Sequence, residues 1–406
     1  MAKTFAYRAK DSKGQEIIGS ILADNENAVA VHIREKGYFI TQIKEKRDSR
    51  SVQAFIENLR SVNIKEIAVF CRLFSTMIDA GLSLVIALNI LIEQTENPRL
   101  KAALQDVYKK IKEGEPLSRA LRDYPRIFPS IMINMIEAGE VGGMLDDALS
   151  RLAIHFEKEH KMNQKIRSAM AYPTVVSVIA VGAVGFILTC VLPTFVTMFQ
   201  EANMKLPWIT SMLLELSNFL RSNILIIIPL LVIGFYGMRL ALQKEKFKKK
   251  FDIIVLKLPI VGMLTRKIGI ARFSRTFSTL LHSGVPIISA LEVVQKTMGN
   301  LCMIEALEGA LGGIKEGRSL ALTLADTKMF TSMVTQMVSI GEESGALDKM
   351  LEKVADFYES DVDDMITRMN SIIEPLIIVA LGMVIGTIIL AIMIPMFDVM
   401  SGAMVK

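Results

Sequence analysis

Few residues of this 406-residue chain have the types and spacing that chemistry requires. Gly312–Ser319 reads GGIKEGRS and resembles the phosphate-binding pattern GxxxxGK[ST], with Arg318 at the lysine position. Such a loop needs a strand before it and a helix after it, so that backbone N–H groups surround a phosphate. Both flanks here have helical patterns, and the matching position 203 residues earlier is Glu115, which would repel phosphate. We interpret this segment as a loop between helices.

Side chains that bind zinc or act as nucleophiles are scattered. His155 and His160 are five residues apart, so they do not share a helix face as a zinc pair would, and we expect both on a solvated face. No GxSxG, HExxH or CxxC motif is present, and Cys71, Cys190 and Cys302 lie far apart. We therefore predict that the chain is not an enzyme.

Carboxylates of the N-terminal half offer one metal candidate. A hard cation such as Ca²⁺ prefers oxygen ligands, and we name Glu93 and Asp146 as its nearest candidates. They belong to an acidic set that comprises Glu93, Glu96, Glu140, Asp146 and Asp147. Lys296 stands 203 residues after Glu93, so a duplicated site is not expected. Ordinary surface carboxylates are the alternative, and no other cofactor is predicted.

A long internal duplication organises the chain. FCRLFST at 70–76 returns as FSRTFST at 273–279, an offset of 203 residues. GEVGG at 139–143 returns as GEESG at 341–345, an offset of 202. A period of this length indicates a duplicated domain and favours a paired docking surface over a catalytic pocket. We call residues 63–170 the first repeat and residues 242–372 the second repeat.

Both repeats are predicted to be helical bundles, because apolar residues recur at three-to-four spacing. Gly81 and Gly284 are expected at turns between helices. The GExxG element is expected to be a tight turn followed by a helix start, with Asp146 and Asp348 favourable near the helix N-terminus. Before the first repeat, alternating residues and a turn at Asp11–Gly14 predict a small ββαβ module.

Three uncharged runs are candidates for membrane spans: 172–199, 222–238 and 375–397. A bilayer core needs about 20 apolar residues per helix; the alternative for each run is a buried core helix. Prolines recur in the outer runs with an offset of 202 (Pro173 and Pro375, Pro193 and Pro395), so matched helix kinks are expected.

Lysines and arginines flank the first run on its N-terminal side and the second run on its C-terminal side, so these flanks are predicted to be cytoplasmic. The predicted organisation is a module (1–47), a linker (48–62), the first repeat (63–170), span one (171–199), an external loop (200–221), span two (222–241), the second repeat (242–372), span three (373–398) and an external tail (399–406).

These motifs together resemble the inner-membrane platform proteins of type IV pili and type II secretion, the PilC/GspF family. The resemblance covers nearly the whole chain. The residues that carry it are FxRxFST with its copy, Gly114 with LSxAL at 117–121, AGExxGxL at 138–145 and Tyr172-Pro173. It implies a mainly α polytopic membrane protein with two six-helix cytoplasmic bundles (F-domains), three transmembrane helices and a small N-terminal α+β module.

The resemblance also implies a function without catalysis. Such a platform in the bacterial inner membrane couples a cytoplasmic hexameric ATPase to the extraction and polymerisation of pilins; the type II secretion platform, acting on pseudopilins, is the alternative, and a small membrane transporter is a more remote one. Expected partners also include other inner-membrane assembly proteins, membrane lipid and further copies of the chain (a dimer or more). Nucleic acid is not expected, because the net charge is only +5.

Four polar residues of the repeats are candidates for contact with the motor: Arg72, Glu140, Arg275 and Glu342. The alternative for each is intramolecular pairing that holds its bundle together. The resemblance further implies that Ca²⁺ on the first repeat would use acidic residues such as Glu93 and Asp146.

Overall fold

Beyond residue 60, every regular element in the described part of the chain is a helix. The structure is a computed structural model, and it describes residues 3–10, 16–23, 26–35, 37–45, 61–201 and 207–403. By its contacts the chain divides into two compact units, Met1–Asn63 with Leu88–Lys109, and Ile64–Ala87 with Lys110–Lys406. Most of the predicted linker 48–62 lies outside the described residues.

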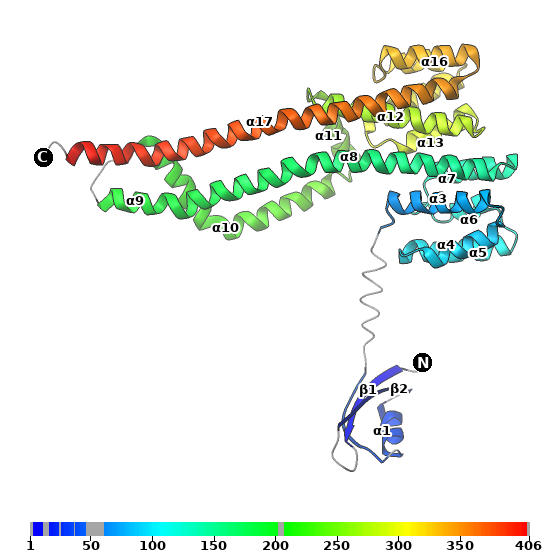
Figure 1. Cartoon of the computed structure of the whole chain (residues 1–406), viewed down its shortest axis with the longest axis horizontal. Helices are drawn as coiled ribbons and strands as arrows, with labels where there is room; N and C mark the ends of the chain where they lie inside the picture. Colours follow the sequence, from blue (N-terminus) through cyan, green and yellow to red (C-terminus); the bar gives the residue numbers. More distant parts are fainter. Residues whose placement is uncertain are drawn as a thin grey trace. The chain divides into compact units, whose positions relative to one another are not determined.

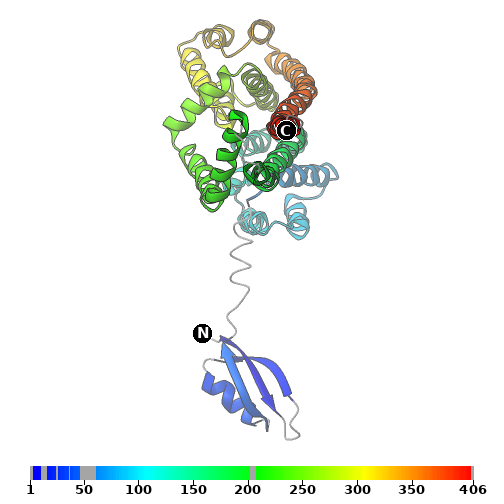
Figure 2. The same cartoon turned by 90° about the vertical axis from the view of Figure 1, so that its left-hand side faces the viewer.

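The N-terminal strands form an antiparallel sheet in the order β2-β1-β3, with α1 on one face (Figure 2). Alternation along β1 places Phe5 and Ala9 on the face where they pack with Val29 and Ile33 of α1. A register slip of one residue would turn both side chains away from this core. The elements are β1 (Lys3–Lys10), β2 (Glu16–Ala23), α1 (Glu26–Glu35) and β3 (Phe39–Glu45).

The same six helices recur in the same order in both repeats (Figure 1), and in the second repeat they are preceded by a further helix, α11 (Glu245–Lys257). In the first repeat they are α3 (Ile64–Asp79), α4 (Leu84–Gln94), α5 (Pro98–Lys112), α6 (Leu117–Arg122), α7 (Ser130–Gly142) and α8 (Leu145–Phe186). In the second they are α12 (Val261–His282), α13 (Ile287–Thr297), α14 (Leu301–Lys315), α15 (Leu320–Asp326), α16 (Ser332–Ser344) and α17 (Leu347–Ala403).

The phenylalanines of the FxRxFST motif build matching aromatic cores. In the first repeat, the ring of Phe70 lies 5.4 Å from that of Phe74 and 6.3 Å from that of Phe128. In the second, Phe273 lies 5.5 Å from Phe277 and 4.8 Å from Phe330. Tilted ring pairs at these separations stabilise a core beyond simple burial. The motif thus places its aromatic residues inward and leaves its arginine for another face of the helix.

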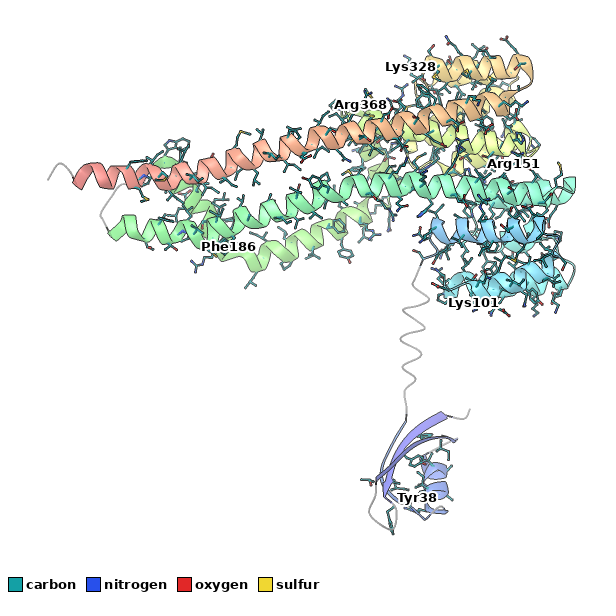
Figure 3. The ribbon with its side chains drawn as sticks, in the orientation of Figure 1. Tyr38, Lys101, Arg151, Phe186, Lys328 and Arg368 are labelled. Carbon is teal, nitrogen blue, oxygen red and sulfur yellow. The ribbon has the colours of Figure 1, made fainter. Side chains whose placement is uncertain are left out.

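Two membrane-length helices continue directly from the repeats. Leu145–Thr197 and Leu347–Phe397 are long and apolar enough to cross a membrane. The first is built from α8, a π-helical turn η1 (Ile187–Val191) and α9 (Leu192–Glu201). Phe186, labelled in Figure 3, is 63% exposed although it is aromatic, as expected for a side chain that faces lipid.

A third apolar helix, α10 (Trp208–Ala241), bends by 60° between Asn223 and Leu225 and counts as a further span only if its two parts are taken together. Residues 208–221, predicted as part of an external loop, are helical. Helix α11 (Glu245–Lys257) follows α10. The expected match of the proline-containing helices is incomplete, because a π turn precedes Pro193 whereas α17 continues as an α-helix through Pro375 and Pro395.

Candidate functional site: the charged seam between the two repeats

The arginine of each FxRxFST motif forms an intramolecular fork with a glutamate. Nε and Nη2 of Arg72 donate to the two carboxylate oxygens of Glu157 at 2.6 and 2.7 Å. The equivalent Arg275 donates to Glu359 at 2.7 and 2.9 Å and also to Asp356. These fork bonds tie α3 to α8 and α12 to α17. The hydrogen bonds from Arg72 lower the pKa of Glu157.

The glutamate of each GExxG element caps a neighbouring helix. Glu140 on α7 accepts from the backbone N–H groups of Leu117 and Ser118, at 2.5 and 3.2 Å, and from the Ser118 hydroxyl. These N–H groups open α6, where the N-cap residue is Pro116 and has no capping side chain. Glu342 accepts the corresponding bonds from Leu320, Ala321 and Ser319 at the start of α15.

The glycines of the same element permit close packing and a reversal. A Cβ at Gly139 would lie 2.8 Å from the Cβ of Ala148, so only glycine lets α7 approach α8 this closely. Gly143 and Gly345 end their helices in the left-handed region, at φ 68° and 67°. The predicted tight turn is therefore correct only for the last residue of the element, because Gly139–Gly142 still belong to α7. Asp146 and Asp348 do lie in the first turns of the helices that follow.

The other motif residues lie in turns and connections between helices. Gly81 and Gly284 have φ of 82° and 79° at turns between helices, as predicted. Residues 312–315 form the last turn of α14, and residues 316–319 connect α14 to α15; Arg318 pairs with Asp326 at 2.6 Å. The interpretation as a loop between helices is therefore correct for residues 316–319 and wrong for residues 312–315, which are helical.

The calcium candidates are both exposed. Glu93 lies near the end of α4 and Asp146 in the first turn of α8. Within the described residues, no three His, Cys, Asp or Glu side chains form a group that could hold a metal ion. One member of the acidic set, Glu140, is engaged as the α6 cap, and Asp147 pairs with Arg151. Calcium binding by Glu93 and Asp146 stays a prediction.

A line of charged and polar side chains joins the first repeat to the second. We call it the seam, and it comprises Lys158, Asn163 and Lys165 of α8 with Arg272 of α12 and Asp356, Glu359 and Asp363 of α17. Nζ of Lys158 lies 3.2 Å from Asp356 and 3.5 Å from Glu359. Lys165, two helical turns further on, pairs with Asp363. Arg272 donates to Asn163 at 3.2 Å.

Burial concentrates at the end of the seam nearest the cores. His155 is 6% exposed, so its predicted position on a solvated face is wrong; residues of the second repeat cover it. Burial, together with the charges of Arg275 and Arg272, lowers the pKa of His155 to about 4. Burial also raises the pKa of Glu159, whose Oε2 lies 3.9 Å from Nε2 of His155. The imidazole is therefore neutral near pH 7.

The apolar ends of α8 and α17 carry polar contacts that the sequence did not predict. An α-helical carbonyl accepts from the N–H four residues on, so Pro395 leaves the carbonyl of Ala391 without its donor. The Thr210 hydroxyl of α10 donates to this carbonyl at 2.7 Å. Both partners are fully buried.

Pro193 likewise leaves a backbone carbonyl without its N–H donor, but in a π-helical turn. In η1 the N–H of Leu192 bonds the carbonyl five residues back, so Leu188 would need the N–H that Pro193 lacks. The Ser217 hydroxyl donates to the Leu188 carbonyl at 2.5 Å. Thr210 and Ser217 are seven residues apart on one face of α10. Two hydroxyls at that spacing were the available sequence clue, although Ser211, Glu215 and Asn218 are also polar residues of this part of α10.

Known proteins align with nearly the whole chain. It is 39% identical to the type IV pilus assembly protein PilC of Thermus thermophilus, over 98% of each chain. It is 36% identical to PilC of Myxococcus xanthus, over 98% of this chain and 95% of that one. It is 33% identical to the type II secretion system protein F of Vibrio cholerae, over 97% and 98%.

Family profiles match both repeats. The profile for "Type II secretion system (T2SS), protein F" matches residues 70–193 and 273–395. The profile for the N-terminal domain of the same proteins matches residues 1–44. The two long matches start at the FxRxFST motif of each repeat and end in the apolar helices. The chain therefore belongs to the type II secretion system protein F family, which includes the PilC proteins of type IV pilus assembly.

Proposed function

We propose that this chain is the inner-membrane platform of a type IV pilus assembly machine. The observation that carries the proposal is full-length identity of 39% and 36% to two proteins named for type IV pilus assembly. In this proposal the platform couples a cytoplasmic hexameric ATPase to the extraction of pilins and their addition to a fibre. The chain itself has no catalytic role and needs no cofactor.

Continuous helices support a mechanical role. Helix α17 has 57 residues and runs without interruption from the second repeat into the apolar segment. At 1.5 Å per residue it is about 85 Å long. Movement imposed on the repeats would pass along α8 and α17 to the pilin helices in the bilayer. The seam would make the two long helices move together, since its ion pairs join them at two points.

Charge placement supports an orientation. The basic flanks at Lys158–Arg167 and Arg239–Lys250 support an arrangement with both repeats and the N-terminus in the cytoplasm and the C-terminus outside. The repeats would then meet the ATPase, while the spans meet pilins and other inner-membrane assembly proteins. Arg72, Glu140, Arg275 and Glu342 all have intramolecular partners, so motor contact would use mainly the exposed Arg72–Glu157 pair. Two or more copies would assemble around the fibre.

A platform of type II secretion is the second candidate. It is supported by 33% identity to protein F of Vibrio cholerae and 31% to that of Xanthomonas campestris, over nearly the full length. Pilins and pseudopilins would be handled through the same spans, so the two candidates share the mechanism and differ in cargo.

Deletion of the gene in the source bacterium distinguishes the candidates. Surface fibres are counted by electron microscopy and secreted proteins are assayed in parallel, with the wild-type gene supplied in trans as the control. A pilus platform predicts lost fibres with intact secretion. Intact fibres with lost secretion would identify the type II platform, and no change in either would contradict both.

A further inference from the structure

One face of helix α11 packs against the following helices of the second repeat. It begins at Glu245, four residues after α10 ends at Ala241. Asp252 of α11 is 9% exposed, and its carboxylate accepts from the backbone N–H of Leu301 at 2.8 Å. This bond satisfies the first N–H of α14 and fixes the rotation of α11 on the repeat. The faces that α11 turns away from the repeat are therefore defined.

One of those faces is apolar and exposed. Phe247, Phe251, Ile254 and Leu258 are 59, 41, 59 and 46% exposed. Spacings of four and three residues place Phe247, Phe251 and Ile254 along one side of α11, and Leu258 follows as the extended C-cap residue. We call these four residues the α11 stripe. Phe251 also lines a cavity with residues of α12 and α14, but all four side chains keep at least 41% of their surface exposed, which is unusual for two phenylalanines so close together.

Lysines border the stripe. Six of them lie between residues 244 and 257: Lys244, Lys246, Lys248, Lys249, Lys250 and Lys257. Within the described residues only Lys249 has an ion pair, with Glu305 at 2.6 Å. At 3.6 residues per turn, Lys246, Lys250 and Lys257 fall along one edge of the stripe. Their charges are free to meet an acidic surface beside the apolar one.

We propose that α11 is an interfacial helix that binds the anionic headgroups of the membrane leaflet next to it. The stripe would enter the acyl boundary, while the edge lysines extend to headgroup phosphates. A lipid surface is favoured as occupant because α11 follows an apolar helix after three residues, and because an apolar face edged by lysine is the pattern of interfacial helices. The inference rests on the membrane placement proposed above, but not on which fibre or secretion machine is served.

The test places a fluorophore on the stripe of the full-length protein in lipid nanodiscs. Cys190 and Cys302 are replaced by serine, while Cys71 is buried and is kept. Phe251→Cys is labelled with an environment-sensitive dye, and quenching by doxyl-labelled lipid is measured in phosphatidylcholine with and without phosphatidylglycerol. The matched control is Ile340→Cys on α16, which is apolar and 52% exposed.

The proposal predicts strong quenching at position 251, none at 340, and an increase at 251 when phosphatidylglycerol is present. Replacing Lys246, Lys250 and Lys257 by glutamine should lower the equilibrium constant for docking of α11 on the membrane about fivefold per lysine. It should also remove the dependence of quenching on phosphatidylglycerol. Replacing the exposed Lys109, Lys349 and Lys353 by glutamine should leave it unchanged.

Three results would overturn the proposal. The first is a dye at position 251 that is exposed to water and is not quenched. The second is quenching that changes neither with phosphatidylglycerol nor with substitution of the edge lysines. The third is a dye that is shielded from water but is not quenched by doxyl lipid, which would mean that protein covers the stripe. A deletion strain with normal fibres would reject the pilus function and leave this measurement unaffected.

Discussion

Glu140 and Glu342 show how a polar residue of a repeated motif serves the fold of its own repeat. Each accepts two backbone N–H bonds at the start of a helix to which it does not belong. A carboxylate at a helix N-terminus is favourable both as an acceptor and in the field of the helix. Capping within the repeat is therefore enough to explain why each motif has a glutamate, without a contact to another protein. A role of Glu140 or Glu342 in motor contact stays a prediction.

Removing the Glu140 cap should open the start of α6. Glu140→Ala is expected to destabilise that turn by about 1 kcal/mol, because two N–H groups lose their acceptor. Amide hydrogen exchange at Leu117 and Ser118 should become about fivefold faster. The control is Glu113→Ala, whose carboxylate lies exposed in the preceding turn. Unchanged exchange at both amides in Glu140→Ala would contradict the capping role.

His155 should make stability depend on pH. Its pKa is lowered to about 4, whereas an unfolded histidine titrates near 6.5. The folded state therefore binds fewer protons between these values, so stability is full above about pH 6.5 and is lost as pH falls toward 4. From about pH 7 to about pH 5 the loss should be about 2 kcal/mol.

Comparison with His155→Phe isolates this effect in a pH series of thermal unfolding. Arg272, Arg275, Lys158, Glu159 and Glu359 face the same small cavity and are present in both proteins. The raised pKa of Glu159 acts in the opposite direction, since a proton taken up by the folded state stabilises it as pH falls. The variant should lose less stability than the wild type over this range. Equal losses would show that the buried imidazole is not the titrating group.

At the scale of elements, prolines and hydroxyls form a matched system. Pro395 and Pro193 free the carbonyls of Ala391 and Leu188, and α10 supplies a hydroxyl to each. In an apolar environment an unpaired carbonyl is costly, so these bonds hold α10 against the other two apolar helices. This gives a physical reason for prolines that recur at the same offset as the repeats.

Thr210→Val combined with Ser217→Ala should loosen this contact. Each lost interhelical bond is worth about 1 kcal/mol, so the double variant should unfold earlier in an SDS titration of the purified protein. Ser211→Ala is the matched control, because its hydroxyl bonds the Trp208 carbonyl of the same helix. If the control and the double variant unfold alike, the interhelical bonds do not hold α10.

Much of the helical architecture follows from sequence because it depends on local patterns. Gly81 and Gly284 marked turns, and the 203-residue offset predicted equivalent helices such as α4 and α13. What could not be predicted depends on distant segments. His155 is buried because the second repeat covers it, and Lys158 meets Asp356 because two long helices lie side by side (Figure 1). The helix at 208–221 was missed since its polar residues were taken for a loop.

At the scale of the whole molecule, the central claim is that continuous helices pass movement from the repeats to the membrane during pilus assembly. A flexible Gly-Ser segment inserted after Arg368, which Figure 3 labels on α17, would break that continuity near the end of the second repeat, beyond its last buried residue Ile366 and before the apolar segment. The same segment inserted in the predicted linker 48–62 is the control, since linkers tolerate insertion.

The measurement is the number of surface fibres per cell in the deletion strain carrying each version, with equal amounts of the protein in the membrane. Transmission through continuous helices predicts no fibres without the chain, full numbers with the wild type and the linker insertion, and few or none with the insertion after Arg368. Fibres in the strain that lacks the chain, or full numbers with the insertion after Arg368, would contradict it.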